Sequence, residues 1–174
     1  KIIHDPKTIF ALDEETSVTP SLRNLVDFIL PLSTSYISIR RFLADHVPGY
    51  EFGRIVQALC QAVDDLLQEY DRDMVSISLE FRNSQIVGET PLTLNNLFVR
   101  VQGHRHTLSI LDRVVLEAKV KKGGCLLNAI RDLKLRMFVG DSQAQAILHL
   151  LLDRSSVPYM AILQSWLETG ILDD

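Results

Sequence analysis

A long periodic stretch in the first half of the chain most constrains how this sequence can fold. Its apolar residues recur at steps of three and four from Phe52 to Phe81, which is the spacing of one face of an α-helix. At 1.5 Å per residue, such a helix is about 45 Å long. Acidic residues between Asp64 and Asp73 occupy other positions of the same stretch. The pattern therefore predicts one long amphipathic helix with a buried stripe and a solvated face.

The same spacing predicts further helices on both sides of this stretch. Thr19-Pro20 has the sequence of a helix start, and the residues up to Leu43 are expected to form one helix with a kink at Pro31. The last helix is expected to end at Gly170 with a Schellman stop, in which Ile171 packs on Trp166. Downstream of the long stretch, the predicted helices are Leu94 to Ala118, Cys125 to Arg136, Ser142 to Arg154 and Pro158 to Thr169.

Almost nothing in the sequence requires a β-sheet. Asp5-Pro6-Lys7 has the sequence of a turn between two short apolar segments, which is compatible with a small β-hairpin near the N-terminus. Antiparallel helices joined by short links form bundles. The predicted fold class is therefore all-α, an elongated helical bundle of about six helices, with residues 1–174 forming a single helical domain.

The composition excludes several classes of partner. Of 174 residues, 47% are hydrophobic, which is too many for a disordered chain, and the formal net charge is -4. Nucleic acid and anionic membranes both require a concentrated basic face, so neither is expected as a partner. The longest apolar run, Ala146 to Leu152, is far shorter than the ~20 residues of a transmembrane helix. Cys60 and Cys125 are far apart, which indicates no disulfide framework and a reducing intracellular setting.

One motif suggests an enzyme. Gly140-Asp141-Ser142 follows an apolar run and looks like the nucleophile block of the Gly-Asp-Ser-Leu hydrolases. That chemistry needs a histidine base oriented by a carboxylate, and the Asp-x-x-His pair of that family occurs nowhere in this chain. Gln143 also replaces the leucine of the motif. The favoured interpretation is that Asp141 caps the next helix, and a serine hydrolase using Ser142 is the least favoured function.

Three other clusters have simple structural explanations. Lys119, Lys121 and Lys122 precede Gly123-Gly124-Cys125, which could bind an anion or activate the thiol, but a flexible turn with a buried thiol is favoured. The acidic residues of the long stretch could be paired catalytic carboxylates, but a solvated helix face is favoured. His104 and His106 are two residues apart and point to nearly opposite sides of a helix, so they cannot readily share a metal. They belong to the patch Gly103-His104-Arg105-His106, which interrupts the apolar pattern of its helix and is favoured as a polar surface patch. The sequence therefore predicts no enzyme activity, no cofactor and no metal.

An ordered set of short blocks resembles the gamma-tubulin complex proteins, and within them the component-two branch. The blocks occur in the family's order from about Thr19 to the end of the chain. They are Ser21-Leu22-Arg23-Asn24-Leu25-Val26, Ile29-Leu30-Pro31-Leu32, Ser35-Tyr36, Arg41-Phe42-Leu43, Glu51-Phe52-Gly53, Gln57-Ala58-Leu59, Gly123-Gly124, Gly140-Asp141-Ser142-Gln143-Ala144-Gln145, Pro158-Tyr159, Leu163, Trp166 and Gly170-Ile171-Leu172-Asp173-Asp174.

The resemblance implies a non-catalytic scaffold in a complex that nucleates microtubules. It implies that the chain is part of an N-terminal half that lies beside neighbouring complex proteins, among them a component-three-like relative, and contacts recruitment factors. Gamma-tubulin would bind through the C-terminal half, which this chain would lack. The chain begins at Lys1 rather than Met and stops at Asp174, so we interpret it as an excerpt of such a protein. The implied location is the cytoplasm and cytoskeleton, at a centrosome or spindle pole.

Side chains on polar helix faces are the expected partner contacts. The candidates are Arg40, Arg41, His104 and Arg105, and the alternative is that they are ordinary solvated side chains. The resemblance implies that family members lie side by side in a ring. Such an assembly needs weak lateral contacts that recur between successive members, and long helices present extended side faces for these contacts. A different possibility is a peptide- or helix-binding adaptor module, which would require an exposed apolar groove.

Overall fold

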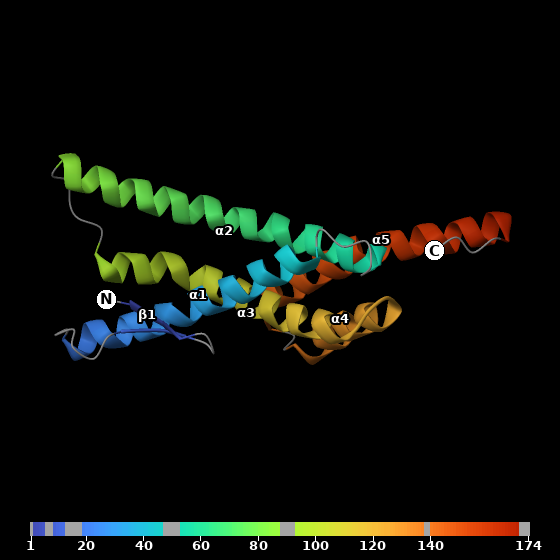
Figure 1. The fold of residues 1–174 in the computed structure, drawn as a ribbon, viewed down its shortest axis with the longest axis horizontal. Coiled ribbons are helices and arrows are strands. Elements are labelled where there is room, and N and C mark those ends of the chain that lie inside the picture. Colours follow the sequence, from blue (N-terminus) through green and yellow to red (C-terminus); the bar gives the residue numbers. More distant parts are fainter. Residues whose placement is uncertain are drawn as a thin grey trace. The chain divides into compact units, whose positions relative to one another are not determined.

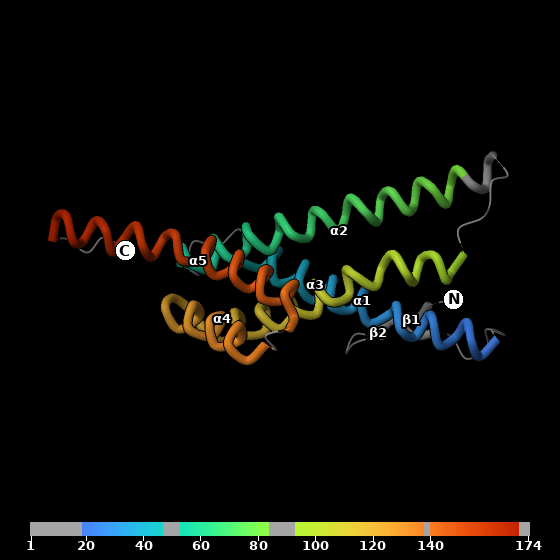
Figure 2. Tube along the Cα trace, turned by 180° about the vertical axis from the view of Figure 1, so that it is seen from behind, coloured from blue at the N-terminus to red at the C-terminus, as the bar shows by residue number. Residues whose placement is uncertain are grey.

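The structure is a computed structural model that describes residues 2–5, 9–12, 19–46, 53–87, 93–137 and 140–170, with side chains in 19–46, 53–83, 93–137 and 140–170. Within these ranges, two short strands precede five α-helices (Figures 1 and 2). The predicted all-α fold is confirmed. The elements are β1 (Ile2–Asp5), β2 (Ile9–Leu12), α1 (Pro20–His46), α2 (Arg54–Val87), α3 (Leu94–Val120), α4 (Gly124–Arg136) and α5 (Ser142–Thr169).

The two strands correspond to the short apolar segments on either side of the turn sequence Asp5-Pro6-Lys7. β1 and β2 pair antiparallel, with Ile2 opposite Leu12 and Asp5 opposite Ile9. They form a two-stranded sheet, and all other described elements are helices. Pro6 and Lys7 of the turn sequence lie outside the described residues.

The first two helices follow the predicted pattern closely. α1 begins at Pro20, with the Arg23 amide donating to the Thr19 carbonyl at 3.0 Å, and it continues through Pro31 as one helix. α2 contains most of the predicted Phe52 to Phe81 helix and extends to Val87, because no Gly or Pro interrupts the chain before Gly88. Phe52 lies outside the described residues.

The prediction of separate helices at Ser142–Arg154 and Pro158–Thr169 is wrong, because α5 is continuous through Pro158. A proline removes one intrahelical bond, here the one to the Arg154 carbonyl, without ending the helix. Just before the proline, the Ser155 hydroxyl donates to the Leu151 carbonyl at 2.6 Å and the Ser156 hydroxyl donates to the Asp153 carbonyl at 2.8 Å. The described chain therefore has five helices rather than about six.

Both ends of α5 carry the predicted cap residues. Asp141 accepts a hydrogen bond from the Ala144 amide at 3.0 Å, which satisfies an otherwise unpaired N–H of the first turn. Gly170 has a left-handed φ of 72°, and its N–H donates to the Trp166 carbonyl at 2.8 Å. This is the single bond of an αL cap. The additional Schellman bond and the packing of Ile171 involve a residue outside the described range.

Contacts along the chain divide it into two compact units. Unit 1 comprises Lys1–Ser38 and Gln68–Ser109, and unit 2 comprises Ile39–Leu67 and Ile110–Asp174. Three helices, α1, α2 and α3, have residues in both units, whereas α4 and α5 belong to unit 2 alone.

Unit 2 contains most of the described buried apolar side chains. α4 lies beside the first half of α5 (Figures 1 and 2), and the Gln145 side-chain amide donates to the Lys134 carbonyl across this contact at 3.0 Å. The burial of these apolar side chains supplies the main favourable free energy for folding of this unit. The buried apolar residues of unit 2 are Ile39, Phe42, Leu43, Val56, Leu59, Cys60, Ala62, Val63, Leu67, Ile110, Leu111, Val114, Val115, Ala118, Leu126, Ala129, Ile130, Ala144, Leu148 and Leu151.

Unit 1 has a smaller described core. Leu30, Leu32, Val101 and Leu108 are buried there, and aromatic rings supply further contacts. Phe28 of α1 and Phe98 of α3 lie 4.9 Å apart between ring centroids, and Tyr36 of α1 and Tyr70 of α2 lie 5.3 Å apart. These tilted pairs connect all three helices within unit 1.

Candidate interaction sites

Arg40 and Arg41 were predicted as partner contacts, and the structure places them differently. The Arg40 guanidinium pairs with the Asp64 carboxylate of α2 at 2.9 Å, and both side chains are about one-third exposed. Arg41 is exposed and makes no ion pair with any residue in the described part of the chain. Within unit 2, Arg40 therefore joins α1 to α2, while Arg41 stays accessible to a partner.

The acidic residues of α2 were interpreted from the sequence as a solvated helix face, and the structure shows that two of them also form ion pairs. Within unit 2, Asp64 pairs with Arg40 of α1, and Asp65 pairs with Arg154 of α5. Exposed pairs of this kind contribute roughly 0–1 kcal/mol each, so they orient the helices more than they stabilise them. The side chains of Asp64 and Asp65 stay about one-third or more exposed, as a solvated face requires, and each also pairs with an arginine of another helix.

In unit 1, His104 is the centre of a contact network between α2 and α3. Its Nε2 lies 2.8 Å from the Asp73 carboxylate, and its ring meets Tyr70 edge-on at 5.3 Å. Only about 21% of the His104 side chain is exposed. The Tyr36 hydroxyl of α1 donates to Asp71 at 2.9 Å next to this network. His104 is therefore partly buried and bonded, not the solvated surface residue that the polar sequence patch suggested.

Arg105 faces α1 instead of α2. Its guanidinium carbon lies 3.6 Å from the centre of the Phe28 ring, which is a cation–π contact, and Phe28 in turn packs on Phe98. The two adjacent candidates, His104 and Arg105, thus attach α3 to different neighbours within unit 1. Gly103, next to them, lies inside the uninterrupted helix α3.

Burial raises the pKa of Tyr70 to about 12, with smaller contributions from neighbouring Tyr36 and Asp71. The folded state therefore holds the phenol proton more tightly than the unfolded chain, whose tyrosines titrate near pH 10. This contribution to stability is complete below about pH 10, and it is lost as the pH rises towards about 12.

We therefore expect the urea concentration at the unfolding midpoint to decrease as the pH is raised from about 10 to about 12. Tyr70→Phe should make this decrease smaller. Urea unfolding followed by circular dichroism at several pH values measures the effect. Tyr159→Phe, on the exposed second half of α5, is the matched control and should leave the pH dependence unchanged. An equal pH dependence in wild type and Tyr70→Phe would contradict the assignment to Tyr70.

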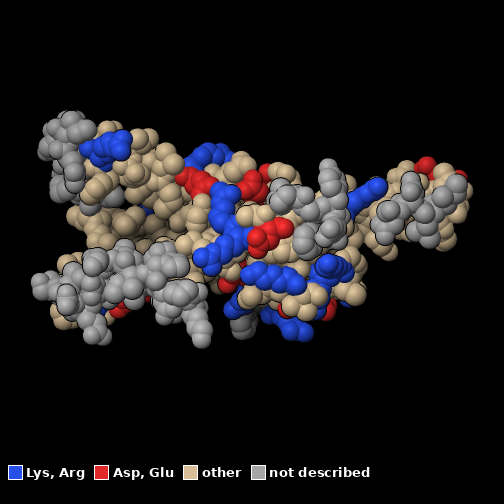
Figure 3. All heavy atoms as spheres, viewed as in Figure 1, with Lys and Arg blue, Asp and Glu red and all other residues tan. Residues whose placement is uncertain are grey.

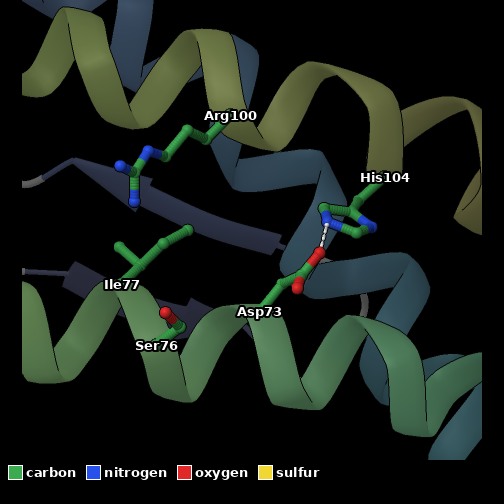
Figure 4. Close-up of a pocket in the computed structure, with 5 residues that line it drawn as sticks. All are labelled: Asp73, Ser76, Ile77, Arg100 and His104. Carbon is green, nitrogen blue, oxygen red and sulfur yellow. Dashed lines mark ion pairs between the residues drawn. The ribbon is translucent and has the colours of Figure 1, made fainter.

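A pocket of about 250 Å³ opens between α2 and α3 in unit 1, here called the α2–α3 pocket. Figure 4 shows Arg100 and His104 projecting from α3 toward α2, with the ion pair between His104 and Asp73 at one end. Arg100 also pairs with Glu80 at 2.6 Å. The described residues that line the pocket are Asp73, Ser76, Ile77, Arg100 and His104.

The sequence patterns identified only part of this pocket. His104 was found because it interrupts an apolar pattern, whereas Arg100, Ser76 and Ile77 were not singled out. Arg100 precedes His104 by one helical turn, a spacing that places both on one face of α3. Asp73 was noted only as part of the acidic stripe. Its pairing with α3 depends on how two helices pack, which no local pattern encodes.

The potential nucleophiles are not assembled into a catalytic site in the described residues. Ser142 is the first residue of α5, and the adjacent Asp141 is used as its cap. His149 pairs with Asp153 one turn later on the same helix, at 3.0 Å. Cys125 is exposed rather than buried, so the predicted buried thiol at this turn is wrong. Burial raises the pKa of the other thiol, Cys60, to about 11, which disfavours its thiolate.

The second half of α5 carries an exposed apolar stripe, here called the α5 stripe. Figure 3 shows this part of α5 as mostly uncharged where grey atoms do not cover it, and Glu168 is the only charged residue between Ser155 and Gly170. Exposed apolar patches of this kind mark interaction surfaces. The members of the α5 stripe are Val157, Tyr159, Met160, Leu163, Trp166 and Leu167.

By length and composition alone, α5 could also cross a membrane. It has 28 residues and a most apolar window with a mean hydropathy of 1.2, of which 22% is buried. Two observations favour a helix of a water-soluble fold. Leu148 and Leu151 are buried among the other helices of unit 2, and the mid-helix residues Asp153 and Arg154 form ion pairs with His149 and Asp65. Charges at the centre of a membrane span are costly.

Comparisons with known proteins give one consistent family. A family model described as gamma tubulin complex component N-terminal matches residues 1–174. Gamma-tubulin complex component 2 of Mus musculus is 32% identical over 158 residues, covering 88% of this chain and 16% of the relative. Gamma-tubulin complex component 2 of Arabidopsis thaliana is 24% identical over 176 residues, covering 100% of this chain and 25% of the relative.

Component 3 relatives match at a similar level. Gamma-tubulin complex component 3 of Homo sapiens is 24% identical over 177 residues, covering 99% of this chain and 19% of the relative. The identities to components 2 and 3 overlap, so they resolve the branch only loosely. The chain spans between 16% and 25% of the length of these three relatives.

Proposed function

Because the chain belongs to the gamma-tubulin complex component family, we propose that it is a non-catalytic scaffold segment of a gamma-tubulin complex that nucleates microtubules. The observation that carries this proposal is the match of the family's N-terminal model along the whole of residues 1–174. The relatives are named as components of that complex, including components 2 and 3.

In this proposal, residues 1–174 make lateral contacts with neighbouring complex components, of which a component-three-like relative is the first expected partner. Arg41, exposed on α1, and the rim of the α2–α3 pocket are the polar surfaces that support such contacts. Gamma-tubulin is expected to bind elsewhere in the full-length protein, and recruitment factors are further partners. The expected location is a microtubule-organising centre, the centrosome or spindle pole, within the cytoplasmic cytoskeleton.

A scaffold of this kind needs rigid helices more than a reactive centre. The helices within each unit are joined by ion pairs, such as Arg40–Asp64 and His104–Asp73, and by aromatic contacts. Several weak lateral contacts can then add up, because a rigid segment pays little conformational entropy when it docks.

The experiment compares the full-length protein with a variant that lacks residues 1–174. Each is co-expressed with the component-three-like relative and gamma-tubulin, and the assemblies are sized by sedimentation through a sucrose gradient. We expect the complete protein to enter a complex with both partners and the shortened protein to be lost from it. Co-sedimentation of the shortened protein at the normal level would count against the scaffold role of this segment.

The second candidate function is a helix-binding adaptor, and the α5 stripe favours it. An amphipathic partner helix could cover these exposed apolar side chains. The stripe lies on one face of a single helix, however, and helix-binding modules usually offer a groove between elements. The scaffold proposal is therefore preferred.

A further inference from the structure

We propose that the α2–α3 pocket receives an acidic side chain from a neighbouring gamma-tubulin complex component. This inference rests on the proposed function, because it names the chemistry of one lateral contact. It assigns the main binding role to Arg100, which lies one turn before His104 on α3.

The size of the pocket selects a side chain rather than a small molecule. Its volume of about 250 Å³ lies below the ~300–1,000 Å³ that is usual for cofactor and small-molecule sites. Its polar residues are also partly open to solvent, with 46% of the Arg100 side chain exposed. An occupant that enters from a protein surface fits this shallow site better than an enclosed ligand does.

The donor groups in the pocket suit a carboxylate. A guanidinium carries five N–H donors in a flat fork, and the ion pair with Glu80 involves one Arg100 nitrogen, Nη1. The remaining donors can hold a second carboxylate in the two-point geometry that makes arginine a frequent interface residue. Ser76, on the facing turn of α2, adds a hydroxyl that can donate to the same group.

The number of hydrogen-bond donors, rather than the net charge, distinguishes an anionic occupant of the pocket from a cationic one. Among the described residues that line the pocket, Asp73 is the one carboxylate, and it already pairs with His104 at 2.8 Å. Arg100 is the one guanidinium in the same described set, and it already pairs with Glu80, which is not in that set, at 2.6 Å. Both lining charges therefore already have one partner. An entering acid would meet the remaining Arg100 N–H donors and the Ser76 hydroxyl, whereas an entering lysine would meet the second Asp73 oxygen.

The shape of the pocket is held by contacts on both sides. Tyr70 packs against the edge of His104, and Ile77 provides an apolar wall beside Arg100. An apolar wall reduces the local dielectric and strengthens a charge-assisted hydrogen bond at its edge. An accessible arginine beside an apolar wall is a combination that is frequent among the strongly contributing residues of protein–protein interfaces.

The test measures binding of the full-length protein to the full-length component-three-like relative. Arg100→Gln removes the charge and is expected to weaken binding by about tenfold or more, as central interface arginines do. Ser76→Trp keeps the charges but fills the pocket, and it should weaken binding as well. Arg113→Gln is the matched control, because it removes an exposed arginine from the same helix away from the pocket. A thermal melt of each variant checks that the fold is kept.

Binding that is unchanged in Arg100→Gln, or retained in Ser76→Trp, overturns the inference while leaving the proposed function intact. Tighter binding of Arg100→Gln also overturns it, because the pocket would then receive a cation through Asp73 or Glu80. If the wild-type proteins do not bind at all, the proposed function itself fails. Weakening in both pocket variants, with Arg113→Gln unchanged, supports the inference.

Discussion

Replacing Leu111 with alanine is expected to lower the free energy of unfolding by about 2–5 kcal/mol. Leu111 lies on α3 within unit 2 and is fully buried, so the variant loses the transfer free energy of the side chain and leaves a cavity. A small domain has roughly 5–15 kcal/mol of stability in total, so this single change removes a large part of it. Urea unfolding monitored by circular dichroism measures the difference.

Leu116→Ala provides the control for this experiment. Leu116 lies on the same helix and in the same unit but is 52% exposed, so the change in helix propensity is identical while little burial is lost. We expect the control to stay within about 0.5 kcal/mol of wild type, as surface substitutions usually do. Equal destabilisation by the two alanines would show that the burial of α3 in unit 2 is wrongly assigned.

Leu148→Asp is expected to have a still larger effect and to abolish the folded state of unit 2. Leu148 is fully buried on the first half of α5, and an unpaired carboxylate there would lose its hydration without gaining a partner. The cost of that desolvation adds to the lost packing, and the sum approaches the whole stability of a domain. Thermal melts and protease resistance of the purified variant measure the loss.

Leu167→Asp makes the same chemical change on the same helix. Leu167 is 71% exposed on the α5 stripe, so its aspartate remains hydrated and the melting temperature should change little. If α5 instead crossed a bilayer, both aspartates would be poorly tolerated and the chain would float with lipid vesicles. Folding of Leu148→Asp at wild-type stability would contradict the placement of the first half of α5 in the core.

Much of the fold follows from local patterns, because helices and their ends depend on near neighbours. The Thr19-Pro20 start of α1, the Asp141 cap and the Gly170 stop are all where the sequence predicts them. Proline shows the limit of such reasoning. Pro31 was correctly placed inside a helix, but Pro158 was taken as a break between two helices. A proline costs a helix one hydrogen bond, and whether the chain continues through it depends on the packing of the whole helix rather than on the local sequence.

The interaction sites could be predicted less well, because they form between helices that are distant in sequence. Asp65 and Arg154 are 89 positions apart, and no spacing rule connects them. The polar interruption at His104 and Arg105 drew attention to the right turn of α3, yet Phe28, Asp73 and Tyr70 decide what those side chains do. The proposed partner contacts at Arg40, Arg41, His104 and Arg105 remain predictions, and Arg41 is the most accessible of the four.

We propose that residues 1–174 contribute to a gamma-tubulin complex that nucleates microtubules. The most direct measurement reconstitutes that complex with the full-length protein, either complete or without residues 1–174, and counts the microtubules formed from purified tubulin. The proposal predicts that removal of these residues abolishes both the assembled complex and its nucleation above background. Assembly and nucleation at the wild-type level without them would contradict the claim.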